Sequence, residues 1–585
     1  NVTEAAIEPS EVKARISQEV LDVVILPTSA IRISQSVIEV VNNLYELVEA
    51  TGTITPTGTL TNEVVQLDDW LAKRVAKRIF LVKLTLRYAP GASVLTDILY
   101  LSNHAYNTRA DEDPANTEYI AVLRDDGLPT FRQELSDTFW GISMPSFGGL
   151  VINNADGQFD AKLPPSRQWE GGEVEVKMTG DRSELDLADA VVLLKGVMGK
   201  VTTTDNTISV EIFSRHRELD QKQVPTDTFT GANDEKIFSP VAYGVCSNVS
   251  GILKDPVNLV YKVAGHGIYS ITGVYDQAVL LSASQYSLDL GNGEFTLNQS
   301  PVGVISCDVL GKQVFGSPTN KRGDFIYDLL ITYGGITSLD FDQASLTQFN
   351  TDAGEASGFY ITSPTSILDA ISQLLQPVMG ELVFSRLGVA SLSVLKLATE
   401  DTGTSLSLTA DEIMPRGGQE SDSSGAGDVL EIRQAEPLYW KVIFNYYQNH
   451  TIQDENSIGS AFPVDPTTAY GRAYRAFLKT EWRTTEIRNE GATTGKNLYP
   501  TAGELGPMDS YFYYRNDAEH WARKWLDLFG QGRRIVSVTA KALPLRTTVN
   551  ATFQLNYRWF NGDRLRSIKY AENWGENVIE IEGII

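Results

Sequence analysis

Short stretches of alternating apolar and polar residues dominate the chain. From Phe80 to Tyr88, apolar residues alternate with Lys83, Thr85 and Arg87, and this two-residue period predicts a half-buried β-strand. Similar stretches recur up to about residue 225, separated by turn signals such as Asp125-Asp-Gly. Asp-Gly favours tight hairpins because glycine adopts a positive φ at little steric cost. We therefore expect an antiparallel β-barrel or sandwich here.

A second β-rich stretch covers residues 240–312, where Gly291-Asn-Gly predicts a hairpin. Two helices are expected after it. The first is capped by Asp324 and ends at Gly334-Gly, and the second starts at Ser363-Pro and stops at Pro377. A hairpin about residues 386–388 completes a compact α+β unit.

The C-terminal part combines strands with one helix. Residues 438–453 (LYWKVIFNYYQNHTIQ) are strongly β-prone and predict a strand pair. A helix is expected from near Asn516 to Gly530, because Trp521 and Trp525 repeat at helical spacing. Strands near residues 535–542, 552–559 and 578–584 follow.

An internal repeat marks the amino-terminal part: RISQEVLDVV at residues 15–24 returns as RISQSVIEVV at residues 32–41. Both copies are rich in β-branched residues, and a strand pair this short cannot bury its own apolar face. One reading is an extended arm that lies on another domain or subunit; the other is a plain local hairpin. For the first reading, the interface residues would be Arg15, Ile16, Val20, Val23, Arg32, Ile33, Val37 and Val40.

The 585 residues favour several domains. We expect a β-rich α+β fold with several small antiparallel β-barrel or sandwich modules, short helices and an extended arm. The expected segments are an arm with a short helix, a β-barrel or sandwich domain, a second β module, a helix-hairpin domain, a flexible Gly/Ser-rich loop and a C-terminal β domain with one helix: 1–79, 80–235, 236–320, 321–416, 417–428 and 429–585.

Charge narrows the classes of partner. With 49 basic and 74 acidic residues, the formal charge is −25, so the surface as a whole repels phosphate backbones and anionic lipid head groups. We expect no stable membrane binding and no general nucleic-acid binding. The acidic start of the sequence lacks a signal-peptide pattern, which favours a soluble chain made in a cytoplasm.

The sequence offers no catalytic constellation that we would name, so we expect no enzyme, cofactor or metal. Five scattered histidines and the two cysteines, Cys246 and Cys307, form no recognisable metal-binding spacing. The loop Asn154–Asp160 (NADGQFD) lacks the ligands of a calcium loop and is read as a turn. The aromatic run 511–514, with Trp482 upstream, favours core or interface packing over sugar stacking.

Several stretches resemble tail-hub proteins of long-tailed bacteriophages, of the type found in Mu-like siphophages and gene transfer agents. They include the two RISQ segments, YLSNHAYNT, INNADGQFDAKLPPSRQWEGGEVEV, LLKGVMGKV with ISVEIFSRHRELD, SPVAYGVCSNVSGILKDPVNLVYKV, YSLDLGNGEFTL and ILDAISQLLQPVMGELVFSRLGVASLSV. Their order covers most of residues 10–400.

The resemblance implies a structural protein of the virion tail tip or baseplate, assembled in the host bacterial cytoplasm. It implies a homotrimeric hub ring that joins the tail tube to the tip or central fibre and surrounds the exit channel. Its partners would be the distal tail or tail-tube protein, the tape-measure protein and tip or fibre proteins, with DNA only as passing cargo during ejection. The alternatives are a receptor- or glycan-binding tail-tip protein and, less favoured, a cell-wall-degrading enzyme.

Overall fold

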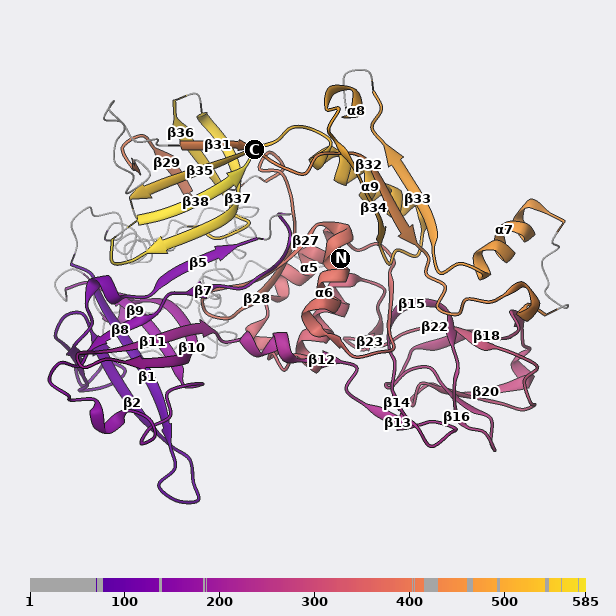
Figure 1. Cartoon of the computed structure of the whole chain (residues 1–585), viewed down its shortest axis with the longest axis horizontal. Helices are drawn as coiled ribbons and strands as arrows, with labels where there is room; N and C mark the ends of the chain where they lie inside the picture. The colour runs from indigo at the N-terminus through magenta and orange to yellow at the C-terminus, as the bar shows by residue number, and fades with distance from the viewer. Residues whose placement is uncertain are drawn as a thin grey trace, which may run out of the picture. The chain divides into compact units, whose positions relative to one another are not determined.

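The computed structural model describes residues 70, 77–135, 139–181, 185, 187–401, 403, 406–414, 430–459, 467–491, 495–541, 547–558, 560–576 and 578–585. The chain divides into two units, Asn1–Asp69 and Trp70–Ile585, and all described residues belong to the second. This unit is strand-rich, with many small sheets and few short helices (Figure 1). The predicted fold class, a β-rich α+β architecture of several modules, is confirmed. None of the described sheets closes into a barrel.

The first sheet has eight strands, and the predicted strand at residues 80–88 is its centre. In spatial order the strands are β3 (Tyr106–Asn107), β4 (Glu118–Ala121), β2 (Leu95–Ser102), β1 (Ile79–Tyr88), β9 (Glu173–Thr179), β10 (Val191–Thr203), β11 (Thr207–Ser214) and β8 (Leu150–Asn153). Neighbouring strands are antiparallel except β2 and β4. An isolated bridge between Leu123 and Ile152 links the segment after β4 to β8. Val82, Leu84 and Leu86 are fully buried, as the alternation in β1 requires.

The second β module is built from two sheets around one apolar core that contains Phe295 and both cysteines. One sheet has the order β19 (Val279–Leu280), β18 (Ser270–Asp276), β22 (Ile305–Leu310), β15 (Val241–Ser250) and β25 (Gly358–Ile361). The other has the order β16 (Ile252–Asp255), β17 (Val260–Lys262), β21 (Glu294–Leu297) and β20 (Tyr286–Asp289). The hairpin predicted at Gly291-Asn-Gly joins β20 to β21 and is confirmed.

A helical unit follows, with α4 (Arg322–Asp328), a π-helical turn (Leu329–Tyr333), α5 (Gln343–Asp352) and α6 (Ile367–Leu375). Two predicted starts are wrong. Asp324 lies inside α4, because Lys321 is the residue before its first turn, and its carboxylate instead accepts hydrogen bonds from Thr319 and Asn350. Helix α6 begins after Ser366, because the residues after Pro364 first form the short strand β26 (Thr365–Ser366).

The hairpin predicted about residues 386–388 joins β27 (Gly380–Phe384) to β28 (Ala390–Val394) and is confirmed. Short strand pairs connect the neighbouring segments: β12 (Gln223–Val224) with β26, β13 (Thr228–Thr230) with β14 (Lys236–Phe238), and β23 (Gln313–Val314) with β24 (Ser317–Pro318).

The C-terminal part holds a large mixed sheet and a three-stranded sheet. The large sheet contains β29 (Leu406–Thr409), β36 (Thr552–Tyr557), β37 (Phe560–Asn573), β38 (Val578–Ile584), β35 (Arg534–Lys541), β30 (Ile413–Met414), β31 (Leu430–Gln434), β5 (Thr130–Glu134) and β7 (Ser146–Phe147). The small sheet has the order β33 (Arg483–Arg488), β32 (Tyr439–Tyr446) and β34 (Gly503–Asp509). The described helices here are α7 (Ala469–Leu478), α8 (Gly495–Leu498) and α9 (Arg515–Phe529).

The strand pair expected within residues 438–453 is wrong, since only β32 forms there. Its two neighbours come from distant segments, β33 and β34, because the residues after Tyr446 leave the sheet instead of turning back along it. The predicted helix is confirmed as α9, which ends at Phe529 and is followed by Gly530.

Strands from distant segments are interleaved. Strand β5 pairs with β37, so residues 130–134 extend the C-terminal sheet. Strand β6 (Gly141–Ser143) pairs in parallel with β27, and β25 pairs with β15 of the second β module. The domain boundaries expected from the sequence stay predictions.

The largest apolar core lies where these segments meet. Its centre is an aromatic group in which the ring of Trp140 lies 4.5 Å from that of Trp525 and 5.5 Å from that of Phe529, measured between centroids. The indole nitrogen of Trp525 donates to the Pro377 carbonyl oxygen at 3.0 Å, which satisfies the polar end of a fully buried side chain.

Candidate functional site

The predicted interface residues Arg15, Ile16, Val20, Val23, Arg32, Ile33, Val37 and Val40 lie outside the described residues, as does the loop 417–428. The structure therefore tests neither the arm nor its role. The candidate sites that remain are surface pockets, buried polar clusters and exposed aromatic rows.

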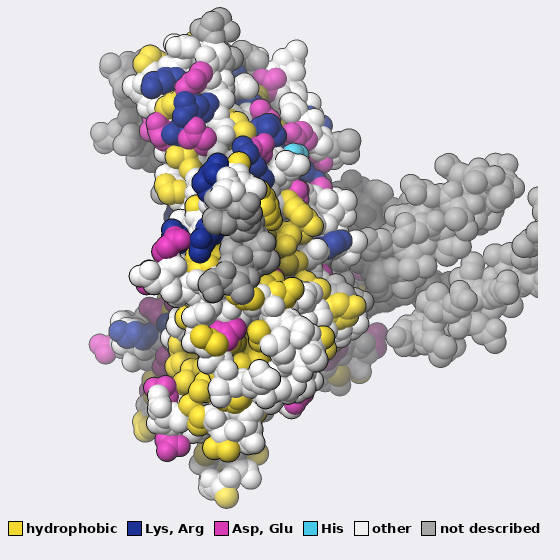
Figure 2. Space-filling view, turned by 90° about the vertical axis from the view of Figure 1, so that its right-hand side faces the viewer, with side chains coloured by type: hydrophobic (Ala, Val, Ile, Leu, Met, Phe, Trp, Pro, Cys, Tyr) yellow, Lys and Arg dark blue, Asp and Glu magenta, His cyan; other side chains and the backbone are white. Residues whose placement is uncertain are grey.

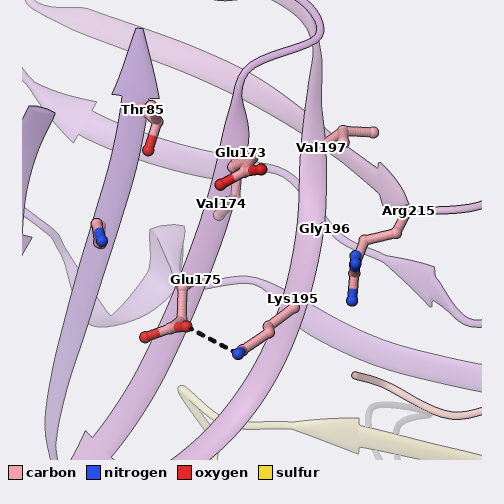
Figure 3. A pocket seen from close by; sticks show the side chains of 9 residues that line it. Thr85, Glu173, Val174, Glu175, Lys195, Gly196, Val197 and Arg215 are labelled. Atoms are coloured by element: carbon pink, nitrogen blue, oxygen red, sulfur yellow. Dashed lines mark ion pairs between the residues drawn. The ribbon is translucent and has the colours of Figure 1, made fainter. Parts of the chain in front are cut away.

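A pocket of about 380 Å³ lies on the eight-stranded sheet, lined by residues of β1, β9 and β10 and by Arg215 (Figure 3). Glu175 forms ion pairs there with Lys195 at 3.3 Å and with Lys177 at 3.2 Å. Burial alone raises the pKa of Glu175, but the two lysines outweigh it and hold that pKa below its ordinary value. Arg215 pairs with Asp340 at 3.4 Å. The charges of this pocket are thus largely neutralised by neighbours, which suits a structural surface.

A buried ion pair connects the β27–β28 hairpin to the C-terminal sheet. The Arg386 guanidinium donates two hydrogen bonds of 2.9 Å to the Glu572 carboxylate, a bidentate geometry. Tyr570 and Trp574 each donate to the same carboxylate at 2.7 Å, and the guanidinium lies 4.1 Å from the ring centroid of Phe131. Burial lowers the pKa of Arg386, but the Glu572 charge raises it above its ordinary value. The Glu572 side chain is buried, and 9% of the Arg386 side chain is accessible.

A second buried carboxylate lies between the same two segments. Glu381 is fully buried and accepts a hydrogen bond from Ser393 at 2.6 Å, with the Arg566 guanidinium at 3.7 Å. Burial raises the pKa of Glu381 above its ordinary value despite the opposing charge of Arg566. This carboxylate has the pKa shift expected of a general acid, but it packs under the sheet instead of lining a cleft.

A third polar cluster lies between the second β module and α4. The Asp328 carboxylate accepts from the Tyr243 hydroxyl at 2.6 Å and from the Lys312 ammonium at 2.7 Å. Burial raises the pKa of Tyr243 well above its ordinary value, and the Asp328 charge adds to the shift. These three buried clusters lie between segments, where they fix one segment against the next.

The aromatic run 511–514 divides into two roles. Phe512 is fully buried, and Tyr511 packs edge-on against Phe359, so this half belongs to the core as predicted. Tyr513 and Tyr514 instead end a row of contacting rings, which we call the tyrosine belt: Tyr470, Tyr474, Phe477, Tyr447, Tyr513 and Tyr514. Its two ends are exposed, with Tyr470 70% and Tyr514 56% accessible. The row could not be predicted from the sequence, because its members come from three separate segments.

The remaining candidates are built as structural elements. In the loop 154–160 the Asn154 side chain donates to Asp160 at 2.8 Å and accepts from the Phe159 backbone at 3.0 Å, which is the predicted turn. Burial raises the pKa of Cys246 to about 12 and that of Cys307 well above its ordinary value, so neither thiol is reactive at neutral pH.

Within the described ranges, no group of three or more His, Cys, Asp and Glu side chains is arranged to hold a metal ion. None of the helices described here is both long and apolar enough to cross a membrane.

Comparison with known proteins gives weak similarities. No family model matches the sequence, and no curated protein matches it. The chain is similar to a chain in the solved virion of a native gene transfer agent particle, with 12% identity, 63% of this chain and 91% of that chain covered, and a TM-score of 0.41. It is also similar to a chain of the Francisella PdpA–VgrG complex in its lidded form, with 7% identity, 94% of this chain and 58% of that chain covered, and a TM-score of 0.28.

Proposed function

We propose that this protein is a structural component of a bacteriophage tail tip or baseplate, which forms a trimeric hub ring. The ring connects the tail tube to the tip or central fibre and surrounds the channel through which the tape-measure protein and then DNA leave. The sequence stretches that resemble tail hubs, in their order along residues 10–400, support this proposal.

The observation that carries it is the position of the buried ion pairs. Arg386–Glu572 and Glu381–Arg566 each join segments far apart in the sequence, and Lys312–Asp328 joins the second β module to α4. The pairing of β5 with β37 reinforces the contact made by Glu572. Breaking a buried ion pair costs free energy, so these contacts resist displacement of one module against another. That rigidity suits a ring that transmits force between tail parts. In this proposal the protein has no enzymatic role.

Electron microscopy of intact tails labelled on this protein tests the proposal. We expect three copies in a ring at the distal end of the tail tube, in contact with the tube and with tip or fibre proteins. A single copy per particle, or a location on the head, would contradict it. The purified protein is also expected to form trimers in light scattering, alone or with the tube protein.

The tyrosine belt favours the second candidate function, a receptor- or glycan-binding tail-tip protein. Exposed tyrosine rings stack on sugars, and Arg483 lies 4.8 Å from the ring centroid of Tyr447 in the middle of the row. Host-wall glycan binding by the wild type, lost in Tyr470→Ala and Tyr514→Ala with trimers intact, would establish this function. Glycan binding by the two variants that is as strong as that of the wild type would rule out this function.

A further inference from the structure

The β1–β2 hairpin ends in an exposed apolar tip. Strand β1 pairs with β9 only as far as Leu84, so the end of the hairpin reaches past its neighbour, apart from a bridge between Arg87 and Gln168. Residues 89–96 (APGASVLT) contain no charged side chain. Val94 is 70% exposed, Leu95 44% and Ile98 37%. A charge-free, apolar loop tip of this kind marks a contact surface more than a solvated turn.

The hairpin is braced on one side. The Asp97 carboxylate accepts from Lys162 at 3.1 Å and from Arg167 at 3.0 Å, and the Arg167 guanidinium lies 3.9 Å from the ring centroid of Tyr88. Together the two cations hold the pKa of Asp97 below its ordinary value, although its partial burial acts in the opposite direction. The tip is therefore held in one shape before it meets a partner, which lowers the entropy cost of binding.

A second apolar surface lies on the second β module. A cavity of about 390 Å³ opens there between the β18–β19 turn and residues 297–302. Its apolar lining is Val279, Leu281, Leu297, Pro301 and Val302. Val302 is 81% exposed, and Leu280 (56%) and Val304 (40%) extend the apolar surface beyond the cavity. Figure 2 faces the side of the molecule that carries β18 and β20 and shows hydrophobic side chains gathered over this module.

The charged side chains of this module are each held by another group of the chain. Residues 240–312 contain eight charged side chains, and each of them contacts another group of this chain: Lys254, Asp255, Lys262, Asp276, Asp289, Glu294, Asp308 and Lys312. Asp276 is the charged residue in the lining of the cavity, and its carboxylate accepts from the backbone of Val302 at 2.7 Å and of Gly303 at 2.8 Å. A partner that buries this surface must itself be free of charge, because an unpaired charge would be desolvated without compensation.

We propose that the β1–β2 hairpin tip of one copy inserts Val94 and Leu95 into this cavity on the next copy. The chain itself supplies a protruding apolar tip and a hollow with an apolar wall, whose one lining carboxylate, Asp276, is already held by backbone N–H groups. The rest of the lining is uncharged, with the polar side chains Gln277, Gln285, Gln299 and Ser300 beside the apolar ones. Because the tip and the hollow are different surfaces of one chain, their contact is head-to-tail, and a head-to-tail contact closes a ring when its rotation fits. The inference rests on the proposed ring and names the contact that builds it.

Cross-linking between two single-cysteine variants tests the contact. Val94→Cys and Val302→Cys are prepared separately, mixed, allowed to assemble and treated with a short bismaleimide. Cys246 and Cys307 are buried, so the background reaction is low. We expect covalent pairs only when both variants are present. Intact trimers without a covalent pair would overturn the contact but leave the ring, whereas monomers under all conditions, with and without the tube protein, would overturn both. A covalent product with a different tail protein would show that the partner at this contact is that protein and not a second copy.

Charge introduced at either surface gives an independent test. Leu95→Asp and Val302→Asp should each abolish the trimer in light scattering, because the carboxylate would be buried against apolar groups. Leu339→Asp is the matched control, since Leu339 is 91% exposed and lies outside both surfaces. It should assemble as the wild type does. Circular dichroism confirms that the variants fold, and trimers in both surface variants would refute the proposal.

Discussion

At the scale of single residues, most buried charges in the described part of the chain are paired; Arg322 is an exception, since its guanidinium donates to the carbonyl oxygens of Leu374 and Ser510. Glu572 receives four hydrogen bonds, from Arg386, Tyr570 and Trp574, which satisfy both of its oxygens. A buried ion pair of this kind stabilises the fold little more than an apolar pair would. The loss of one partner, however, leaves the other charge buried without compensation. The surface pair Arg124–Asp126 is different, because water replaces either member at small cost.

Arg386→Met should lower the free energy of unfolding by about 3–5 kcal/mol, since Glu572 would remain buried without its cation. Arg124→Met, whose partner is exposed, should change it by less than about 0.5 kcal/mol. Urea denaturation followed by tryptophan fluorescence measures both values. Equal losses in the two variants would show that burial does not govern these pairs.

His450, which packs against the second β module, makes the fold sensitive to acid. Its backbone N–H donates to the Ser247 carbonyl oxygen, and its ring packs edge-on against Tyr360. Burial lowers the pKa of His450 to about 4, so the folded state holds this imidazole neutral. The unfolded chain binds the proton at about pH 6.5, so stability from this group is full above that pH and is lost as the pH falls toward 4.

His450→Gln should therefore flatten the acid side of the stability profile. Between pH 7 and pH 4.5 the wild type should lose up to about 3 kcal/mol more than the variant, since each pKa unit is worth about 1.4 kcal/mol. Denaturation midpoints of both proteins at the two pH values give the difference, in which the carboxylates common to both cancel. Parallel profiles would show that His450 is protonated without cost in the folded state.

At the scale of elements, patterns that are local could be predicted and those that depend on distant partners could not. Helix α9 follows from the spacing of Trp521 and Trp525, and the β27–β28 hairpin from Gly388. Helix α5 escaped prediction because it buries few apolar residues, chiefly Leu346 and Phe349. Strand β37 escaped because its charges, such as Arg566, are neutralised only by other segments.

The turn at Gly388 shows why that hairpin needs glycine. Its φ is +86°, and an added Cβ would lie 3.2 Å from the Arg215 side chain and 3.3 Å from His216. Gly388→Ala should cost about 1–3 kcal/mol. Gly91→Ala in the β1–β2 turn meets no atom within 4 Å and should be neutral or slightly stabilising. Thermal unfolding separates the two, and a neutral Gly388→Ala would mean that the turn relaxes.

At the scale of the whole molecule, the sites escaped the sequence because tertiary structure creates them. The loop Ala89-Pro-Gly could be predicted as a turn, but its exposure beyond β9 follows from sheet register. The cavity on the second β module combines residues 276–302 with Gly459, far away in the chain. The class of function that we propose rests on the resemblance to tail hubs, whereas the contact surfaces required the positions of exposed side chains.

The amino-terminal arm belongs to this scale, because its predicted role is to join copies. The strand pair predicted at residues 15–24 and 32–41 could not bury its apolar face alone, so we expect it to pack on a neighbour. Deletion of residues 1–50 should leave the body folded, with the circular dichroism and thermal midpoint of the full chain, and should weaken assembly. The hairpin contact proposed above is untouched by the deletion, so residual trimers should still yield the Val94–Val302 cross-link. Light scattering of the truncated protein, alone and with tail components, decides the matter: assembly at the concentration of the full chain would assign the arm a local role only.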